Sequence, residues 1–197
     1  MNLANKITVT RIILAIILLV LLLVPWEAIN LNFPVYLVGN TMVSLKYIIA
    51  GIIFLVASVS DFLDGYIARS RNMVTDFGKV TDAIADKILV NGVLIILAYE
   101  RFIPVVIPVI IITRDIIVDT CKMISGNKGK VVAASIAGKI KTVCMMCGLT
   151  LTFFYNMPFE LINFDLATFL LIIATIMSII SGCQYFYNTK KYFINDK

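Results

Sequence analysis

Long apolar stretches alternate along this chain with short clusters of charged residues. Most of these stretches approach the length of about 20 residues that a helix needs to cross the hydrocarbon core of a bilayer. The pattern predicts six helices, which run approximately over Ile7–Pro25, Ser44–Arg69, Lys79–Tyr99, Pro104–Ile124, Gly138–Tyr155 and Leu161–Tyr187. We therefore predict an all-α fold, a polytopic membrane protein with six transmembrane helices, in which residues 1–197 form one domain.

The composition supports a membrane protein. Of the 197 residues, 60% are hydrophobic and only 15% are charged, and the mean hydropathy is +0.97. A soluble domain of this length cannot bury so much apolar surface. The apolar run after Arg11 ends in Val24-Pro25-Trp26 without the small-residue pattern of a signal-peptide cleavage site, so we expect a retained first helix. The chain has four cysteines and no histidine, which favours neither a disulfide framework nor a zinc site.

The basic residues predict the orientation in the membrane. With six crossings both termini share one side, and most Lys and Arg residues fall on that side: Lys6, Arg11, Arg69, Arg71, Lys79, Lys122, Lys128, Lys130, Lys139, Lys141, Lys190, Lys191 and Lys197. The positive-inside rule then places both termini in the cytoplasm, in a protein of the cytoplasmic membrane. The formal net charge of +5 concentrates on this face and favours anionic lipid and phosphorylated substrates as partners. We expect no nucleic-acid partner, because aromatic residues do not alternate with these charges.

One acidic stretch carries the strongest chemical signal. It reads Asp61-Phe-Leu-Asp64-Gly65-Tyr-Ile-Ala68-Arg69, then eight residues, then Gly78-Lys-Val-Thr-Asp82-Ala-Ile-Ala-Asp86. At about 100° per residue, the named positions of the first part share one helix face within roughly 140°, and those of the second part share a face of the next helix. A short connection makes these helices antiparallel neighbours, so four carboxylates can converge at their cytoplasmic ends.

Four converging carboxylates repel one another, and a divalent cation removes this repulsion. Carboxylate oxygens favour hard ions such as Mg²⁺ or Mn²⁺, and four aspartates can bridge two ions in phosphoryl chemistry. Arg69 can bind a phosphate with two parallel hydrogen bonds. The alternative is that Asp61 and Asp64 are solvated residues at a helix end, but acidic residues at a membrane edge more often mark a functional site.

The acidic stretch resembles the signature of the CDP-alcohol phosphotransferase family, Asp-x-x-Asp-Gly-x-x-Ala-Arg, eight residues, Gly-x-x-x-Asp-x-x-x-Asp, with every position filled. The resemblance implies six membrane helices, a homodimer and a metal-dependent phosphotransferase. It implies that Asp61, Asp64 and Asp82 hold one metal ion, that Asp61, Asp82 and Asp86 hold a second, and that Asp86 is also the general base. It further implies a CDP-lipid site, which we assign to Thr8, Gly65, Ala68, Arg69 and Gly78.

Two further segments point to the acceptor alcohol. The opening Asn2-Leu-Ala-Asn5-Lys-Ile-Thr8-Val-Thr-Arg11 and the block from Arg114 to Thr142 resemble the phosphatidylglycerophosphate synthases within that family. This resemblance implies CDP-diacylglycerol and glycerol 3-phosphate as substrates, in anionic phospholipid biosynthesis. A dianionic acceptor needs fixed positive charge, so we expect Arg114, Lys139 and Lys141 to bind its phosphate. Arg114 lies inside a predicted span and needs a partner, and the alternative is an ion pair with Asp115 or Asp119.

Rival functions remain at this point. Inositol phosphate, phosphatidylglycerol or serine could replace glycerol 3-phosphate as the acceptor. A divalent metal transporter could use the same aspartates, although transporter sites lie near the bilayer midplane, often at interrupted helices. A lipid-binding scaffold without catalysis would not explain four converging carboxylates.

Overall fold

The computed structural model describes residues 3–39, 41–70, 76–127 and 135–194, and their side chains except at 3–8, 62–70, 76–80, 82, 127 and 191–194. Within these ranges the chain forms α-helices, two 3₁₀ helices and a two-stranded sheet: α1 (Leu3–Leu23), η1 (Trp26–Ile29), β1 (Val35–Val38), β2 (Thr41–Ser44), α2 (Leu45–Ser70), α3 (Asp76–Tyr99), α4 (Val106–Asn127), α5 (Ile136–Phe153), η2 (Phe159–Ile162) and α6 (Leu166–Ile194). The predicted all-α class is confirmed, with the short sheet as an addition.

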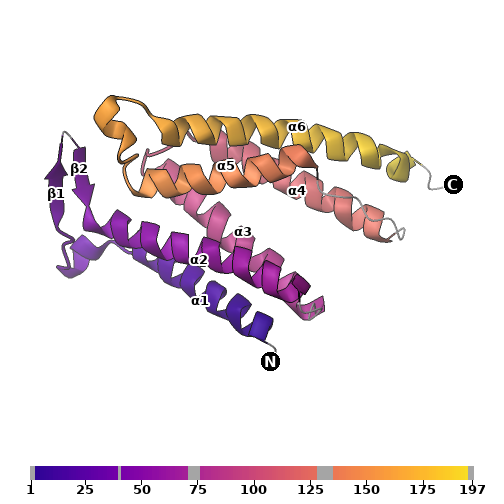
Figure 1. Ribbon diagram of the computed structural model, residues 1–197, viewed down its shortest axis with the longest axis horizontal. Helices are drawn as coiled ribbons and strands as arrows, with labels where there is room; N and C mark the ends of the chain where they lie inside the picture. The colour runs from indigo at the N-terminus through magenta and orange to yellow at the C-terminus, as the bar shows by residue number, and fades with distance from the viewer. Residues whose placement is uncertain (1–2, 40, 71–75, 128–134, 195–197) are drawn as a thin grey trace.

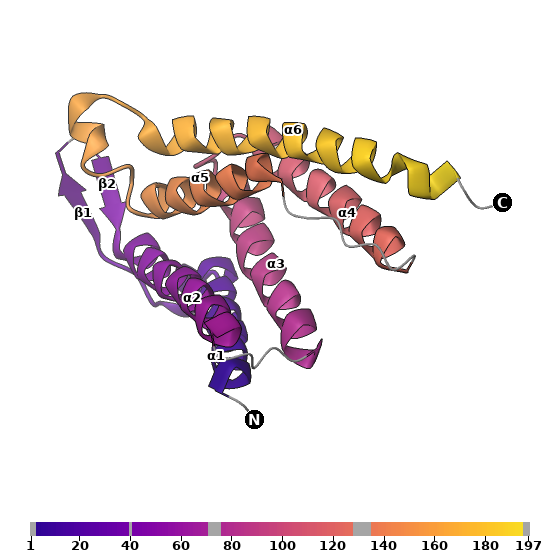
Figure 2. The same cartoon turned by 45° about the vertical axis from the view of Figure 1, so that its right-hand side comes forward.

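The helices form two groups (Figure 1). α1 packs against both α2 and α3, while α6 packs against both α4 and α5. Contacts of α2 with α5 and of α3 with α4 join the groups. The groups diverge toward the end where both termini lie, and the β1–β2 hairpin lies at the opposite end (Figure 2). This divergence separates the cytoplasmic-end charges predicted for α2 and α3 from those of α4 and α5.

The core that joins the two groups is apolar and tightly packed. Phe54 of α2 and Phe153 of α5 are both fully buried, and their ring centroids lie 5.6 Å apart. Beside them, Gly51 allows the close approach of α2 and α5, because a Cβ there would lie 2.8 Å from the Cβ of Phe153. A small residue at a helix contact lets two backbones approach closely.

Several predicted boundaries shift by a few residues, and local hydrogen bonds accompany the shifts at the starts of α6 and α4. α6 begins at Leu166 rather than Leu161, because residues 159–162 form η2, which ends at Asn163 in the left-handed conformation (φ 52°). The Asp165 carboxylate then accepts a hydrogen bond of 2.9 Å from the Thr168 backbone N–H, which caps the new helix. α4 begins at Val106, and the carbonyl of Pro104 accepts a hydrogen bond from the Ile107 N–H.

The sequence pattern did not predict the β1–β2 hairpin. Its strands pair antiparallel with Val35 opposite Ser44 and Val38 opposite Thr41. Gly39 adopts a positive φ of 62° in the turn, which glycine accepts without steric cost. Strands of four residues carry too little periodicity to be distinguished from an apolar connection.

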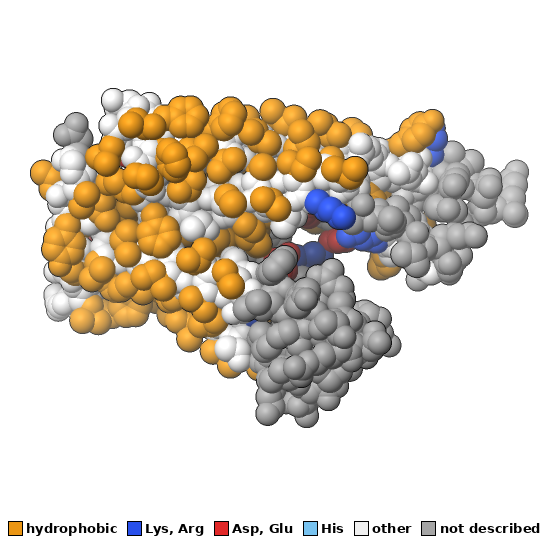
Figure 3. All heavy atoms as spheres, in the orientation of Figure 1, with side chains coloured by type: hydrophobic (Ala, Val, Ile, Leu, Met, Phe, Trp, Pro, Cys, Tyr) orange, Lys and Arg blue, Asp and Glu red, His pale blue; other side chains and the backbone are white. Residues whose placement is uncertain are grey.

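Apolar side chains cover most of the described surface on the face shown in Figure 3. Within the described ranges, α5 over Ile136–Phe153 and α6 over Leu166–Lys190 are long and apolar enough to cross a membrane, and α1 has a shorter apolar stretch, Val9–Leu23. The charged residues inside α2, α3 and α4 lower the apolar character of these helices. Six membrane crossings therefore stay a prediction.

Candidate active site

A hollow opens where the two helix groups diverge, and charged side chains line it (Figure 3). The rest of the same face is predominantly apolar. Charged side chains within an otherwise apolar surface carry a free-energy cost, and such residues usually mark a functional site. This hollow is therefore the candidate site.

The α1–α3 side of the site contains two residues of the acidic motif, Asp61 of α2 and Asp86 of α3. Both side chains are partly buried. Asp61 forms an ion pair with Arg11 of α1, whose side chain is only 1% exposed. A buried guanidinium is costly unless an opposite charge compensates it, and Asp61 supplies such a charge.

The remaining residues of the acidic motif lie in the helices predicted for them. Asp64, Gly65, Ala68 and Arg69 fall within α2, and Gly78 and Asp82 fall within α3. Their side chains, and that of Thr8 in α1, lie outside the described part of the structure. The convergence of four carboxylates and the composition of the CDP-lipid site therefore stay predictions.

The α4–α6 side of the site brings together two of the three predicted acceptor residues. Arg114 Nη1 donates to Asp115 Oδ1 at 2.8 Å, and Lys141 Nζ donates to both carboxylate oxygens of Asp115, at 2.8 and 2.7 Å. Lys141 of α5 is almost fully buried, whereas Lys139 is exposed and makes no ion pair with any residue that the structure describes. Of the two partners left open for Arg114, Asp115 is therefore the observed one.

Asp119, the other candidate partner of Arg114, pairs instead with Lys87 of α3. Both side chains are partly exposed, at 49% for Lys87 and 40% for Asp119. Because Lys87 follows Asp86 in α3, this ion pair joins the acidic side of the site to α4. An exposed pair contributes little to stability, about 0–1 kcal/mol.

The two sides of the site also interact electrostatically. Asp86 of α3 is close enough to contribute an electrostatic interaction with the ammonium group of Lys141 of α5, although α3 and α5 lie in different helix groups. That the predicted base and the predicted acceptor cluster form one site stays a prediction.

Sequence reasoning missed Arg11, Asp115 as the shared acceptor of two cations, and Ser181 of α6. Arg114 Nη2 donates to Ser181 Oγ, and Ser181 Oγ lies 2.8 Å from Ser135 Oγ. The available signal for Arg11 was a single basic residue inside an apolar helix, which needs a buried partner. Ser181 had no such signal, because serine is common in membrane helices.

The donors of the acidic side fit a hard divalent cation. Asp61 and Asp86 supply carboxylate oxygens, which are the ligands that Mg²⁺ and Mn²⁺ prefer. Among residues with described side chains, no group of three or more His, Cys, Asp and Glu comes together. Since Asp64 and Asp82 are outside that set, the predicted metal ligands stay a prediction.

A mainly helical protein with many exposed apolar side chains, an acidic motif and a basic cluster has the features expected of a membrane enzyme that handles phosphate esters. The chain belongs to the CDP-alcohol phosphatidyltransferase family, whose sequence profile matches residues 1–180.

Three relatives carry the same name, CDP-diacylglycerol–glycerol-3-phosphate 3-phosphatidyltransferase. The Bacillus subtilis protein is 37% identical over 185 residues, which cover 94% of this chain and 93% of that protein. The Rickettsia typhi protein is 31% identical over 193 residues, covering 98% of this chain and 99% of the relative. The Mycoplasma genitalium protein is 35% identical over 154 residues, covering 78% of this chain and 65% of that longer protein.

Proposed function

We propose that this chain transfers the phosphatidyl group of CDP-diacylglycerol to sn-glycerol 3-phosphate, giving phosphatidylglycerophosphate and CMP. The observation that carries the proposal is the presence of two charged clusters, the Arg11–Asp61 pair of the acidic motif and the Arg114–Asp115–Lys141 cluster, with Asp86 interacting electrostatically with Lys141. Three relatives named for this reaction match most of the chain, and this supports the choice of substrates.

The carboxylates would hold the divalent metal. Asp61, Asp64 and Asp82 would bind one Mg²⁺ or Mn²⁺ ion, and Asp61, Asp82 and Asp86 a second. Bound there, the ions supply neutralisation of the charge that develops on the phosphoryl oxygens. Arg11 supports this arrangement, because it forms an ion pair with the Asp61 carboxylate.

Asp86 would be the general base. Its electrostatic interaction with Lys141 supports this role, because an acceptor whose phosphate is bound by the remaining donors of Lys141 and Arg114 would have its primary hydroxyl near Asp86. Asp86 takes the hydroxyl proton as the acceptor oxygen attacks the phosphorus on the diacylglycerol side. The bond from that phosphorus to the bridging oxygen breaks, and CMP leaves with the electron pair. Thr8, Gly65, Ala68, Arg69 and Gly78 would bind the CDP-lipid.

The basic cluster can still accept a phosphate while it is paired with Asp115. A guanidinium has five N–H donors, and Arg114 uses one toward Asp115 and another toward Ser181. Lys141 has three donors and uses two toward Asp115. Lys139 adds an exposed charge two residues earlier in α5. These remaining donors favour a phosphorylated acceptor over serine, which carries no phosphate.

The membrane arrangement is part of the same proposal. We propose six crossings of the cytoplasmic membrane, with both termini and the hollow on the cytoplasmic side, in a homodimer of single-domain subunits. The apolar exterior supports membrane insertion, and the position of both termini at the open end of the two helix groups supports the orientation. A water-soluble acceptor would then enter from the cytoplasm, and the lipid from the bilayer.

The metal-transporter alternative has less support. Transporter sites are typically formed where helices are interrupted near the bilayer midplane. α2 and α3, which carry the acidic motif, are continuous helices.

A reconstituted assay tests the proposal. The purified full-length chain with Mg²⁺, CDP-diacylglycerol and radiolabelled glycerol 3-phosphate is expected to form labelled phosphatidylglycerophosphate and CMP. Unlabelled inositol phosphate, serine and phosphatidylglycerol should compete poorly. Preference for any of these acceptors would overturn the acceptor assignment, and the absence of any transfer together with Mg²⁺ flux into liposomes would favour the transporter.

A further inference from the structure

The guanidinium of Arg114 is held from one side by three residues of α6. Ser181 Oγ accepts a hydrogen bond from Arg114 Nη2, and Ser181 is fully buried. The centre of the guanidinium lies 5.8 Å from the ring centroid of Tyr185, whose side chain is only 4% exposed. This distance is within the range of a cation–π interaction.

Gly182 gives the stem of Arg114 its space. A Cβ at position 182 would lie 3.0 Å from Arg114 Cγ, closer than nearly all real contacts of this kind. Gly182 and Arg114 also line a groove of about 330 Å³ between α4 and α6, which is otherwise almost entirely apolar. The absence of a side chain at position 182 therefore lets Arg114 lie against α6.

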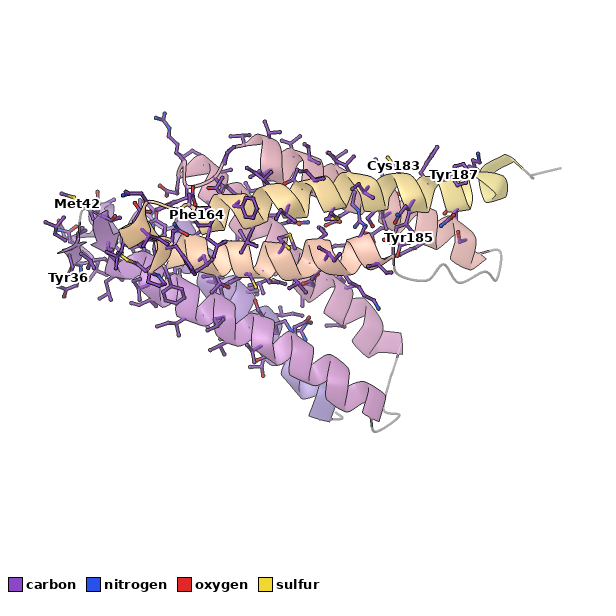
Figure 4. All side chains as sticks on the ribbon, turned by 45° about the horizontal axis from the view of Figure 1, so that its top comes forward. Tyr36, Met42, Phe164, Cys183, Tyr185 and Tyr187 are labelled. Carbon is purple, nitrogen blue, oxygen red and sulfur yellow. The ribbon has the colours of Figure 1, made fainter. Side chains whose placement is uncertain are left out.

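The three residues occupy one face of α6. Positions 181, 182 and 185 follow the i, i+1, i+4 spacing of a helical face. Figure 4 shows Tyr185 on the side of α6 toward α4, with Tyr187 on the other side. Tyr187 is 67% exposed, whereas Tyr185 is buried, so only Tyr185 lies in the interface between α6 and its neighbours.

Ser181 further connects Arg114 to the start of α5. Its Oγ lies 2.8 Å from Ser135 Oγ, and Ser135 caps α5 by accepting a hydrogen bond of 3.1 Å from the Gly138 N–H. A Cβ on Gly138 would lie 3.2 Å from Ser181 Oγ, so the contact is close on this side as well. Because α5 carries Lys139 and Lys141, Ser181 relates the positions of all three acceptor residues.

We propose that Ser181, Gly182 and Tyr185 form an Arg114 cradle, which positions the guanidinium to bind the phosphate of the acceptor. The proposal rests on the proposed function of Arg114 as an acceptor-binding residue. The cradle residues lie just beyond residue 180, where the match to the family profile ends. None of them belongs to the acidic motif.

The physical effect of the cradle is preorganisation. A free arginine side chain populates many rotamers, and a ligand that binds it must restrict them. The cradle restricts the Arg114 side chain before the acceptor binds. It therefore lowers the entropy cost of acceptor binding. The KM for glycerol 3-phosphate should therefore depend on the cradle, while the KM for CDP-diacylglycerol and kcat should not.

Ser181→Ala tests the hydrogen bond, and Ser178→Ala is its matched control. Ser178 is also fully buried in α6, and its Oγ has no hydrogen-bond partner among the residues that the structure describes. For the full-length enzyme with Mg²⁺, Ser181→Ala is expected to raise the KM for glycerol 3-phosphate about fivefold to twentyfold, less than the loss of a direct hydrogen bond between a charged group and the acceptor, because Ser181 acts through Arg114. Ser178→Ala should leave this constant unchanged, and thermal unfolding should show that both variants are folded.

Tyr185 provides a second test that does not depend on Ser181. Tyr185→Phe keeps the aromatic face and should bind the acceptor like the wild type, whereas Tyr185→Leu should raise the KM for glycerol 3-phosphate about twofold to tenfold. A structural role alone would affect both substrates, so KM for CDP-diacylglycerol is measured for each variant. If Ser181→Ala does not fold, the KM values of Tyr185→Phe and Tyr185→Leu for glycerol 3-phosphate decide whether the cradle proposal holds.

Arg114→Ala, alone and combined with Ser181→Ala, separates the cradle from the proposed function. If the cradle acts through Arg114, the double variant has the same KM for glycerol 3-phosphate as Arg114→Ala alone. If Arg114→Ala raises this constant while Ser181→Ala and Tyr185→Leu do not, the cradle is wrong and the acceptor site stands. If Arg114→Ala leaves the constant unchanged, the acceptor assignment fails, and the cradle proposal fails with it.

Discussion

Arg11 of α1 and Asp61 of α2 form an ion pair in which the arginine is almost fully buried and the aspartate is partly exposed. The ion pair therefore links Asp61, the first aspartate of the acidic motif, to α1. We expect this pair to matter for folding as well as for metal binding.

Breaking the Arg11–Asp61 pair from one side should destabilise the protein. Asp61→Ala removes a partner of a buried guanidinium, and we expect a loss of about 3 kcal/mol, at the lower end for such pairs because Asp61 is partly exposed. The double variant Arg11→Met, Asp61→Ala should recover most of this loss but no turnover. Unfolding in detergent micelles measures both effects, and a double variant no more stable than Asp61→Ala would contradict the prediction.

Removal of divalent metal should abolish activity reversibly. We expect EDTA to stop CMP release and Mg²⁺ or Mn²⁺ to restore it, because the motif carboxylates need a cation to bind a diphosphate. Mg²⁺ should also raise the unfolding temperature of the wild type, since a ligand that binds only the folded state stabilises it. This shift should disappear in Asp61→Asn. Turnover that persists after thorough chelation would argue against a metal-dependent mechanism.

Asp86→Asn should affect chemistry more than binding. Loss of a general base typically lowers the rate by about a hundredfold to ten thousandfold, so turnover should fall in this range while binding of the CDP-lipid largely survives. Asp61→Asn should reduce both, because Asp61 is the predicted bridge between two metal ions. Parallel binding and single-turnover measurements on the two variants compare these roles, and identical losses of binding and turnover would remove the special role of Asp86.

Lys139 and Lys141 should respond differently to truncation. Lys139 is exposed, so Lys139→Ala should weaken acceptor use without loss of stability. A hydrogen bond to a charged group contributes about 1.5–3 kcal/mol, which corresponds to about a tenfold to hundredfold rise in KM for glycerol 3-phosphate. Lys141→Ala should also lower the unfolding temperature, because the buried Lys141 shares Asp115 with Arg114. A rise in KM for CDP-diacylglycerol instead would assign these lysines to the nucleotide-lipid site.

Labelling from each side of the membrane tests the orientation. In a background without the native cysteines, a single cysteine at Asn127 should react with an impermeant reagent only from the cytoplasmic side. A cysteine at Asn30, which ends η1 near the hairpin, should react only from the outside. Reaction of both positions from the same side would contradict six crossings.

Several features of the site depended on long-range contacts. The sequence offered Asp115 and Asp119 equally as partners for Arg114, and the structure selects Asp115 because Lys87 of α3 occupies Asp119. The pairing of Arg11 with Asp61 joins residues 50 positions apart, and no local pattern indicates it. Ser181 has no signal of its own, because its role exists only when α6 lies against α4.

The sequence by itself determined the helices and the acidic motif. The length of an apolar run and the spacing of aspartates along a helix are local properties, so α1 to α6 lie near their predicted positions and the motif lies in α2 and α3. Only the tertiary structure decided which charges neutralise one another and which residues position Arg114. The reason is physical: the free energy of a buried charge depends on partners within a few ångströms, and packing of distant segments brings these partners together.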